Sequence, residues 1–401
     1  MNLLNKENNE KKKKMAFATR SIHGPKKYAL DVYGITNPVT TPIYMTSAFN
    51  VKQALNGVLP NYIYTRGSNP TITELQEKIA DLENGEDCQA FGSGMAAISG
   101  TLLALGKKGT ILADPEIYGG SHNLLKKQLI NLRMKVKFVN FNNIEEVQNN
   151  ITDDTKVLYF ESPCNPTMKF IDIEEIVQIA KEKPGILTIF DNTLNSPYNL
   201  NPIDYGVDVV VHSCTKYISG HGDTLGGASI TNKKINYKIM KSLQEFGGVI
   251  SPFNAWLLLR GLKSLKVRMQ QHNQNAQKLA EYLETRDDKI DKVLYPGLKS
   301  FSQYEIAKKY LKNGFGGVLS FYLKKGLNLS KFFSNLEIPA YTVSLGDTDT
   351  LIEDPFNLSH FGMPRKVKLS LGIMPYMVRV SVGIEDINDL ISDFKKALDS
   401  V

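Results

Sequence analysis

The chain has 401 residues, of which 42% are hydrophobic and 22% are charged, as in ordinary soluble globular proteins. This length predicts a large α/β body with at least one smaller unit. The formal net charge is +7, but the lysines of EKKKK at residues 10–14 supply part of it. Elsewhere the sequence has no basic stripe with interleaved aromatic residues, so it does not indicate nucleic-acid binding.

The sequence also argues against membrane insertion, disulfide bonds and metal catalysis. No apolar run reaches the roughly 18 residues that span a bilayer, and no apolar signal core follows the basic N-terminus. Cys88, Cys164 and Cys214 form no C-x-x-C pair, and the six histidines lack metal-ligand spacing. We therefore predict a cytoplasmic protein without metal, membrane or nucleic-acid partners.

The N-terminal region reads as two segments without a core of their own. Residues 1–14 predict a disordered basic extension, and Met15 is a possible alternative start of translation. Residues 15–70 are rich in turn-forming residues, as in LPNYIYTRGSNP, and show little periodicity. We expect this segment to be an arm that contacts a neighbouring subunit.

Residues 71–262 predict a large domain built from alternating strands and helices. A first helix begins with Thr71 or Thr73 as its cap and ends at Gly85. Further helices are expected in MAAISGTLLALG, GSHNLLKKQLINL and DIEEIVQIAKEK, and strands in GTILADP, VKFVNF, KVLYFESP, LTIFDNT and DVVVHSCTK. Strands separated by helices favour a mostly parallel sheet covered on both faces.

Residues 263–401 predict a smaller α/β domain at the C-terminus. Residues 251–286, which cross the expected boundary, read as one long, bent helical tract. Strands are expected in GGVLSFYL and YMVRVSVG, and a final helix in EDINDLISDFKKAL.

Polar residues follow several of the predicted strands of the large domain, where α/β proteins bind ligands. Gly92, Ser93 and Gly94 stand at a turn that enters a helix, a place that favours an anion, although such glycines often mark a turn only. Tyr118 stands at a second strand-to-helix junction. Its ring either stacks on a planar ligand or is a buried structural residue of the core.

Two further strand ends carry acidic residues. Glu161 and Asn165 lie in the proline-stiffened loop ESPCNPT, and Asp191 follows an apolar strand. Taken alone, Asp191 reads as a helix-capping residue.

Together with Lys216, these residues at the strand ends predict a single cofactor site. Lys216 follows an apolar strand and is flanked by Ser213 and Thr215, whose hydroxyls can hold a phosphate while the lysine amine bonds to a carbonyl. A phosphate cradle, a stacking aromatic ring, a carboxylate and a lysine together predict pyridoxal phosphate as cofactor. Cys164, Cys214 and His221 lie near this stretch but read as structural residues.

The same stretches resemble the Cys/Met-metabolism family of pyridoxal-phosphate enzymes from about Ser21 onward. The resemblance is carried by YTRGSNPT, FGSGMAAI, YGG, ESPCNPT, DNT, SCTKYISGHGD, RGLKSL, VSLGD and RVSVG. It implies the aspartate-aminotransferase-like fold, called fold type I, with a mostly parallel central sheet and a smaller C-terminal α/β domain. It also implies a homotetramer built as a dimer of dimers.

The resemblance implies roles for individual residues. Lys216 holds the cofactor covalently and moves protons, Asp191 pairs with the cofactor's ring nitrogen, and Tyr118 stacks on the ring and protonates a leaving thiol. The expected phosphate ligands are Gly94, Met95, Ser213 and Thr215, together with Tyr64 and Arg66 from a neighbouring subunit. Arg379 is expected to bind the substrate α-carboxylate, assisted by Ser344 and Asn165.

Two positions bear on the substrate and disagree. Cystathionine-handling relatives tend to carry an acidic residue where this chain has Val343, so valine favours methionine. Methionine γ-lyases usually carry cysteine where this chain has Gly120. The stretch DPFNLSHFGMP also departs from the family's HPASMTH, which predicts a reshaped loop over the substrate.

We therefore predict a lyase that eliminates a γ-thiol from methionine or a close analogue to give 2-oxobutyrate, ammonia and a thiol. A cystathionine γ- or β-lyase is one alternative, and a γ-replacement transferase such as cystathionine γ-synthase or O-acetylhomoserine sulfhydrylase is another. A binding or regulatory protein of the same fold without turnover is the alternative from a different class.

Overall fold

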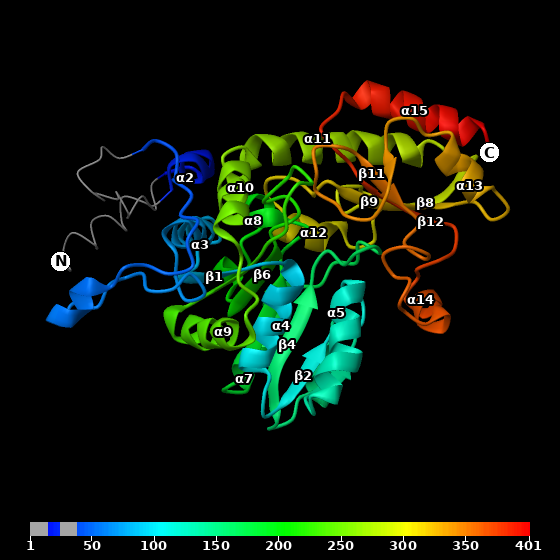
Figure 1. The fold of residues 1–401 in the computed structure, drawn as a ribbon. Helices are drawn as coiled ribbons and strands as arrows, with labels where there is room; N and C mark the ends of the chain where they lie inside the picture. The colour runs from blue at the N-terminus through cyan, green and yellow to red at the C-terminus, as the bar shows by residue number, and fades with distance from the viewer. Residues whose placement is uncertain (1–14, 25–37) are drawn as a thin grey trace.

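The computed structural model describes residues 15–24 and 38–401, so the predicted extension at residues 1–14 lies outside the described residues. Two sheets organise these parts of the chain: a larger one made by the first half and a smaller one made by the last third (Figure 1). None of the helices in the described ranges is both long enough and apolar enough to cross a membrane.

The larger sheet has seven strands in the order β1-β7-β6-β5-β4-β2-β3. From β6 to β3 the neighbouring strands are parallel, whereas β7 pairs antiparallel with both β6 and β1. The strands are β1 (Asp87–Phe91), β2 (Thr110–Ala113), β3 (Lys135–Phe138), β4 (Thr155–Glu161), β5 (Leu187–Asp191), β6 (Val209–Ser213) and β7 (Gly227–Thr231). The mostly parallel sheet predicted from the sequence is confirmed.

Helices cover both faces of this sheet because its central strands are apolar on both sides. One face packs against α4 (Gly94–Leu105) and α9 (Lys233–Phe246), and the other against α3 (Pro70–Leu82) and α7 (Ile173–Glu182). The remaining helical elements of this part are α5 (Gly119–Asn123), the π-helical stretch Leu124–Leu129, α6 (Ile144–Asn150), α8 (Ser196–Asn199) and the 3-10 turn Pro202–Tyr205.

The smaller sheet has five strands in the order β10-β11-β12-β9-β8. Its strands are β8 (Ile290–Leu294), β9 (Val318–Leu323), β10 (Ala340–Tyr341), β11 (Leu351–Glu353) and β12 (Met377–Ser381). Its helices are α11 (Leu265–Glu284), α12 (Tyr304–Tyr310), α13 (Leu329–Ser334), α14 (Arg365–Ser370) and α15 (Ile387–Asp399). The predicted strands at β9 and β12 and the final helix at α15 are confirmed.

Two sequence-based predictions about helices need correction. Residues 251–286 form α10 (Pro252–Leu262) and α11, separated at Lys263–Ser264, rather than one bent helix. The cap of α3 is Asn69, whose side chain accepts a hydrogen bond from the Thr71 amide, and not a threonine. Proline at the first helical position explains this start, because its missing amide hydrogen costs nothing there.

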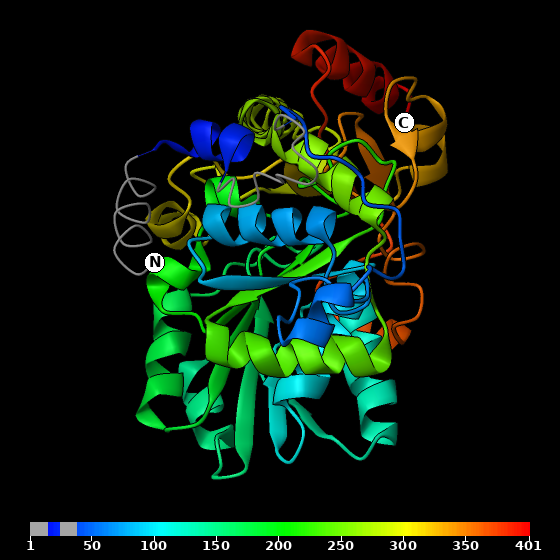
Figure 2. The same cartoon turned by 60° about the vertical axis from the view of Figure 1, so that its left-hand side comes forward.

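Part of the predicted arm lies on its own chain. The helix α2 (Phe17–His23) contacts α3 and α11, and the Trp256 indole donates a hydrogen bond to the Thr41 carbonyl at 3.0 Å. The 3-10 turn Lys52–Asn56 projects from the body instead (Figures 1 and 2). Leu55 and Leu59 near this turn are more than 80% exposed.

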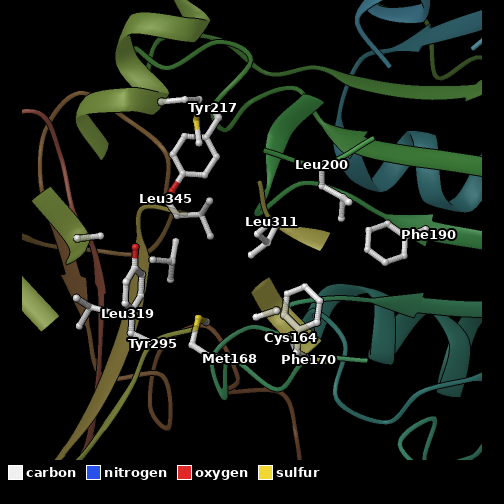
Figure 3. Packing of buried hydrophobic residues seen from close by; sticks show 14 of the residues in the cluster. Cys164, Met168, Phe170, Phe190, Leu200, Tyr217, Tyr295, Leu311, Leu319 and Leu345 are labelled. Atoms are coloured by element: carbon white, nitrogen blue, oxygen red, sulfur yellow. The ribbon is translucent and has the colours of Figure 1, made fainter. Parts of the chain in front are cut away.

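A continuous apolar core joins the two sheets. Figure 3 shows Phe190 of the larger sheet and Leu319 of the smaller sheet in one buried cluster, with Tyr217 next to Leu345. Tyr217 follows Lys216 in the chain, and Leu345 follows Ser344. Packing between the sheets therefore fixes the backbone beside two of the predicted site residues.

Candidate active site

A cavity of about 480 Å³ opens where β4, β5 and β6 end and the smaller sheet begins. Most of the predicted site residues line this one cavity, although the chain brings them from positions nearly 300 residues apart. They are Gly94, Met95, Tyr118, Asn165, Asp191, Ser213, Thr215, Lys216, Val343, Ser344 and Arg379. Tyr64 and Arg66 do not reach it.

The N-terminus of α4 forms one end of the cavity. Ser93 caps the helix, and its hydroxyl accepts a hydrogen bond from the Ala96 amide. A Cβ atom on Gly94 would lie 2.7 Å from the Cβ of Ser213, so glycine is required for this close approach. The amides at the start of α4 and the hydroxyl groups of Ser213 and Thr215 therefore form a cradle suited to a phosphate.

Asp191 is buried at the end of β5. Its Oδ1 accepts hydrogen bonds from the Thr193 hydroxyl at 2.6 Å and from the Thr193 amide at 3.1 Å. Burial raises the pKa of Asp191, while these hydrogen bonds oppose the rise. A cation placed beside the carboxylate would compensate for its burial.

Glu161 holds two predicted site residues by their backbones. Its carboxylate accepts hydrogen bonds from the Tyr118 amide at 3.1 Å and from the Asn165 amide at 3.0 Å. Burial raises the pKa of Tyr118, and the negative charge of Glu353 adds to this rise. The phenol is therefore protonated at neutral pH and able to donate its proton.

Lys216 lies across the cavity, and its Nζ donates a hydrogen bond to the Ser344 hydroxyl at 2.7 Å. Burial, assisted by the positive charge of Arg379, lowers the pKa of Lys216 to about 8. The Ser344 backbone has a φ of 88°, which a non-glycine residue rarely adopts. This left-handed turn places the serine hydroxyl beside the lysine.

Arg379 extends from β12 and is buried. Its Nη1 forms an ion pair with Glu353 Oε1 at 2.8 Å, and its Nη2 donates a hydrogen bond to the Ser344 carbonyl at 2.5 Å. Burial lowers the pKa of Arg379, and Glu353 opposes this shift. The guanidinium is therefore fixed in place in a region of low dielectric.

Tyr64 and Arg66 line a different hollow of about 610 Å³, together with Met45, Thr46, Ser47 and Gly247 among others. The Arg66 guanidinium lies over the Tyr64 ring, with its carbon 5.6 Å from the ring centroid. Both side chains are exposed in the single chain. Their predicted role toward a neighbouring subunit stays a prediction.

The structure adds residues that the motif analysis did not select. Thr193 fixes Asp191 and belongs to the DNT motif, so that motif carried a usable signal. Glu353 left no such signal, because it meets Arg379 only through the pairing of β11 with β12.

The three cysteines are free and buried, and the His221 ring contacts the Ser219 carbonyl. Over residues 15–24 and 38–401, no cluster of candidate ligands could hold a metal ion.

These features fit pyridoxal phosphate. The cradle at α4 suits its phosphate, the buried carboxylate of Asp191 suits a protonated ring nitrogen, and Lys216 has the lowered pKa that bonding to an aldehyde requires. The Asn165 side-chain oxygen is buried beside the cavity, with no hydrogen-bond partner among the described residues. The fold and the site together define a pyridoxal-phosphate-dependent enzyme.

The chain belongs to the family of Cys/Met metabolism PLP-dependent enzymes, whose model matches residues 19–399. It is 40% identical to L-methionine γ-lyase of Fusobacterium nucleatum subsp. polymorphum over 97% of this chain and 99% of the relative. It is also 40% identical to cystathionine β-lyase of Lactococcus lactis subsp. cremoris over 95% and 98% of the two chains. The crystal structure of cystathionine γ-lyase from Lactobacillus plantarum complexed with L-serine superposes with a TM-score of 0.91 at 35% identity, covering 96% of this chain and 99% of that one.

The lowered pKa of Lys216 gives a first testable prediction. In the cofactor-free protein, modification of Lys216 by an amine-directed reagent should increase with pH around a midpoint of about 8, since only the neutral amine reacts. Replacing Arg379 by glutamine removes a cation that lowers this pKa, while Asp347 and Glu353, which raise it, stay. The midpoint should therefore move to higher pH, as measured by mass spectrometry of the Lys216 peptide.

The Arg379→Lys variant is the control for charge and should leave the midpoint close to that of the unchanged protein. A midpoint at the ordinary pKa of lysine, or one that ignores the loss of the guanidinium, would contradict the electrostatic description of the cavity.

Proposed function

We propose that this enzyme cleaves the γ carbon–sulfur bond of L-methionine or a close analogue, giving 2-oxobutyrate, ammonia and a thiol. The chain is a carbon–sulfur lyase of sulfur amino acids, the activity for which the relatives above are named. The relatives named for methionine and for cystathionine β-cleavage are both 40% identical to this chain, so the choice of methionine rests on the cavity itself.

Pyridoxal phosphate, when bound, supplies an electron sink for the negative charge that develops at the substrate Cα. Lys216 is the residue that holds the cofactor and then takes the proton from Cα. Its pKa of about 8 makes the neutral amine accessible near physiological pH. Asp191 holds a proton at the cofactor's ring nitrogen, and Thr193 orients that carboxylate.

Other residues bind the substrate and handle its leaving group. Arg379 binds the α-carboxylate, and Ser344 and Asn165 line the cavity beside it. Tyr118 donates its phenolic proton to the departing sulfur, and its raised pKa keeps the phenol protonated at neutral pH until then. The phosphate is bound from within the same chain by Gly94, Met95, Ser213 and Thr215.

The observation that carries the choice of methionine is the apolar part of the cavity lining. Val343 lies beside Ser344 in that lining, where Leu225 and Leu358 also contribute. Valine offers no partner for a distal ammonium group, whereas it suits a thioether. Gly120 remains the position that disagrees with methionine γ-lyases. A Cβ there would lie 2.5 Å from the Tyr118 ring, so a cysteine would require that ring to shift.

A cystathionine lyase is the second candidate, and a specific observation favours it. A hollow of about 590 Å³ adjoins the cavity and shares Thr215, Leu225, Val343 and Ser344 with it. Asp223 and Asp347 also line this hollow, so a longer substrate with a distal ammonium group would find carboxylates there.

The proposal predicts that the enzyme releases 2-oxobutyrate from methionine without any added thiol. A Val343→Glu variant should shift the ratio of kcat/KM values toward cystathionine by about tenfold or more, since a charge-assisted contact contributes roughly 1.5–3 kcal/mol. Methionine, cystathionine, homocysteine and O-acetylhomoserine should be assayed for the oxoacid and for the free thiol.

Three outcomes of this assay count against the proposal. A product that forms only when thiol is added would establish a γ-replacement transferase. Cystathionine cleaved far better than methionine by the unchanged enzyme would favour the second candidate. Cofactor binding without turnover of any sulfur amino acid would leave a binding protein. If Val343→Glu changes the kcat/KM value for neither methionine nor cystathionine, residue 343 does not contact the distal part of the substrate.

We also propose that two chains complete each active site and that a dimer of dimers forms in the cytoplasm. Tyr64 and Arg66 stand away from the cavity of their own chain, on a segment whose Leu55 and Leu59 are exposed. Exposed apolar residues on a projecting segment are typical of a surface that another subunit covers. Free, buried cysteines suit a reducing compartment.

Co-expression of two inactive variants tests this sharing of sites. Lys216→Ala and Arg66→Ala should each have low activity, because each removes one group that the cofactor needs. In a mixed dimer, one site combines the intact Lys216 of one chain with the intact Arg66 of the other. The mixture should therefore regain substantial activity, measured after purification of the doubly tagged dimer.

If Arg66 serves its own chain, every site in the mixed dimer lacks one group. Activity should then stay at the level of the separate variants, and the sharing of sites would be wrong.

A further inference from the structure

The ion pair between Arg379 and Glu353 joins two strands of the smaller sheet. The two residues are direct partners in the antiparallel pairing of β11 with β12. Their side chains are almost completely buried, with exposed fractions of 2% for Arg379 and 0% for Glu353. Opposite charges in this cross-strand position hold each other on one face of the sheet.

Glu353 is itself held from the stretch that departs from the family pattern. Its Oε1 accepts a hydrogen bond from the Ser359 hydroxyl at 2.6 Å, and that hydroxyl lies 3.0 Å from Nδ1 of His360. Leu358 and Ser359 line the cavity, and the Ser359 carbonyl lies close to Gly119, the residue after Tyr118. Glu353 thus connects the guanidinium of Arg379 to the loop at residues 354–364.

The same pair leaves two buried polar atoms open. Among the described residues, Nε of Arg379 and Oε2 of Glu353 have no hydrogen-bond partner. A buried donor without a partner costs free energy, so Nε is a ready donor for an incoming anion. Within the described part of the chain, Arg379 therefore keeps one N–H group without a hydrogen-bond partner, although its charge is paired with Glu353.

We propose that Glu353 is a positioning residue for the substrate's α-carboxylate: it aims Arg379 and offsets its charge, which limits the affinity for carboxylate ligands. This inference rests on the proposed role of Arg379 as the carboxylate-binding residue. A guanidinium held from the neighbouring strand needs no rearrangement when the substrate arrives.

The charge of Glu353 has a second consequence. With the ion pair formed, the charge of Arg379 is balanced before binding, and the ligand carboxylate then meets the like charge of Glu353 close by. The substrate and the 2-oxoacid product carry the same carboxylate, so Glu353 also favours release of the product. A purely structural glutamate would have no such effect on ligand affinity.

The Glu353→Gln variant separates charge from shape. Glutamine keeps an oxygen that accepts from Arg379 and Ser359, so the guanidinium stays in place while the negative charge is lost. The dissociation constant of L-norleucine, which has the shape of methionine without the sulfur, should fall by about tenfold in the holoenzyme. Pentylamine, which is norleucine without its carboxylate, should gain no affinity, since its ammonium group is not repelled by Glu353; both ligands are measured by titration calorimetry.

Two further variants complete the test. Glu353→Ala removes both the charge and the support, so it should bind norleucine about tenfold more weakly than the glutamine variant does. Glu337→Gln removes an exposed carboxylate paired with Lys396, and it should leave both ligands unaffected. If the alanine variant does not fold, the comparison of glutamine with the unchanged enzyme still decides.

The inference is wrong if Glu353→Gln leaves the affinity for norleucine unchanged or lowers it. It is also wrong if the affinity for pentylamine rises by the same factor. An Arg379→Gln variant shows which idea has failed. If its affinity for norleucine is normal, the proposed carboxylate site at Arg379 is itself incorrect. If its affinity is reduced while Glu353→Gln has no effect, the carboxylate site stands and only the role of Glu353 is rejected.

Discussion

The site depends on the contact between the two sheets at Ser344. This residue, in a left-handed conformation, accepts a hydrogen bond from Lys216 of the larger part through its hydroxyl. Its carbonyl accepts another from Arg379 of the smaller part. A strained backbone persists only where its surroundings fix it, and here the buried packing of Tyr217 and Leu345 supplies that support.

Burial gives each charged group in the cavity its chemical character. Lys216 and Arg379 lose positive charge more readily there, whereas Asp191 and Tyr118 lose protons less readily. The same low dielectric strengthens the interaction of each group with an oppositely charged ligand. A cavity built in this way favours a ligand that brings an anion and a protonated ring nitrogen, as pyridoxal phosphate does.

Local sequence patterns predicted the parallel strands and the residues at their ends, because an apolar strand followed by polar and small residues is a short-range signal. The antiparallel strands β1 and β7 at one side of the larger sheet escaped prediction, since DCQAF and GASIT contain few residues typical of strands. The break between α10 and α11 falls at Lys263–Ser264, where no proline marks it, and Gly261 just before the break still lies within α10. The pair of Glu353 and Arg379 depends on strand pairing, which no local pattern records.

The most direct test of this account is to find the residue that carries the cofactor. Borohydride reduction of the yellow holoenzyme should attach the cofactor permanently to one lysine, and peptide mapping by mass spectrometry should place it on Lys216. Lys216→Ala should bind no cofactor covalently under the same treatment. Attachment to any other lysine, or no attachment in the unchanged protein, would contradict the assignment of the cavity on which the proposed function depends.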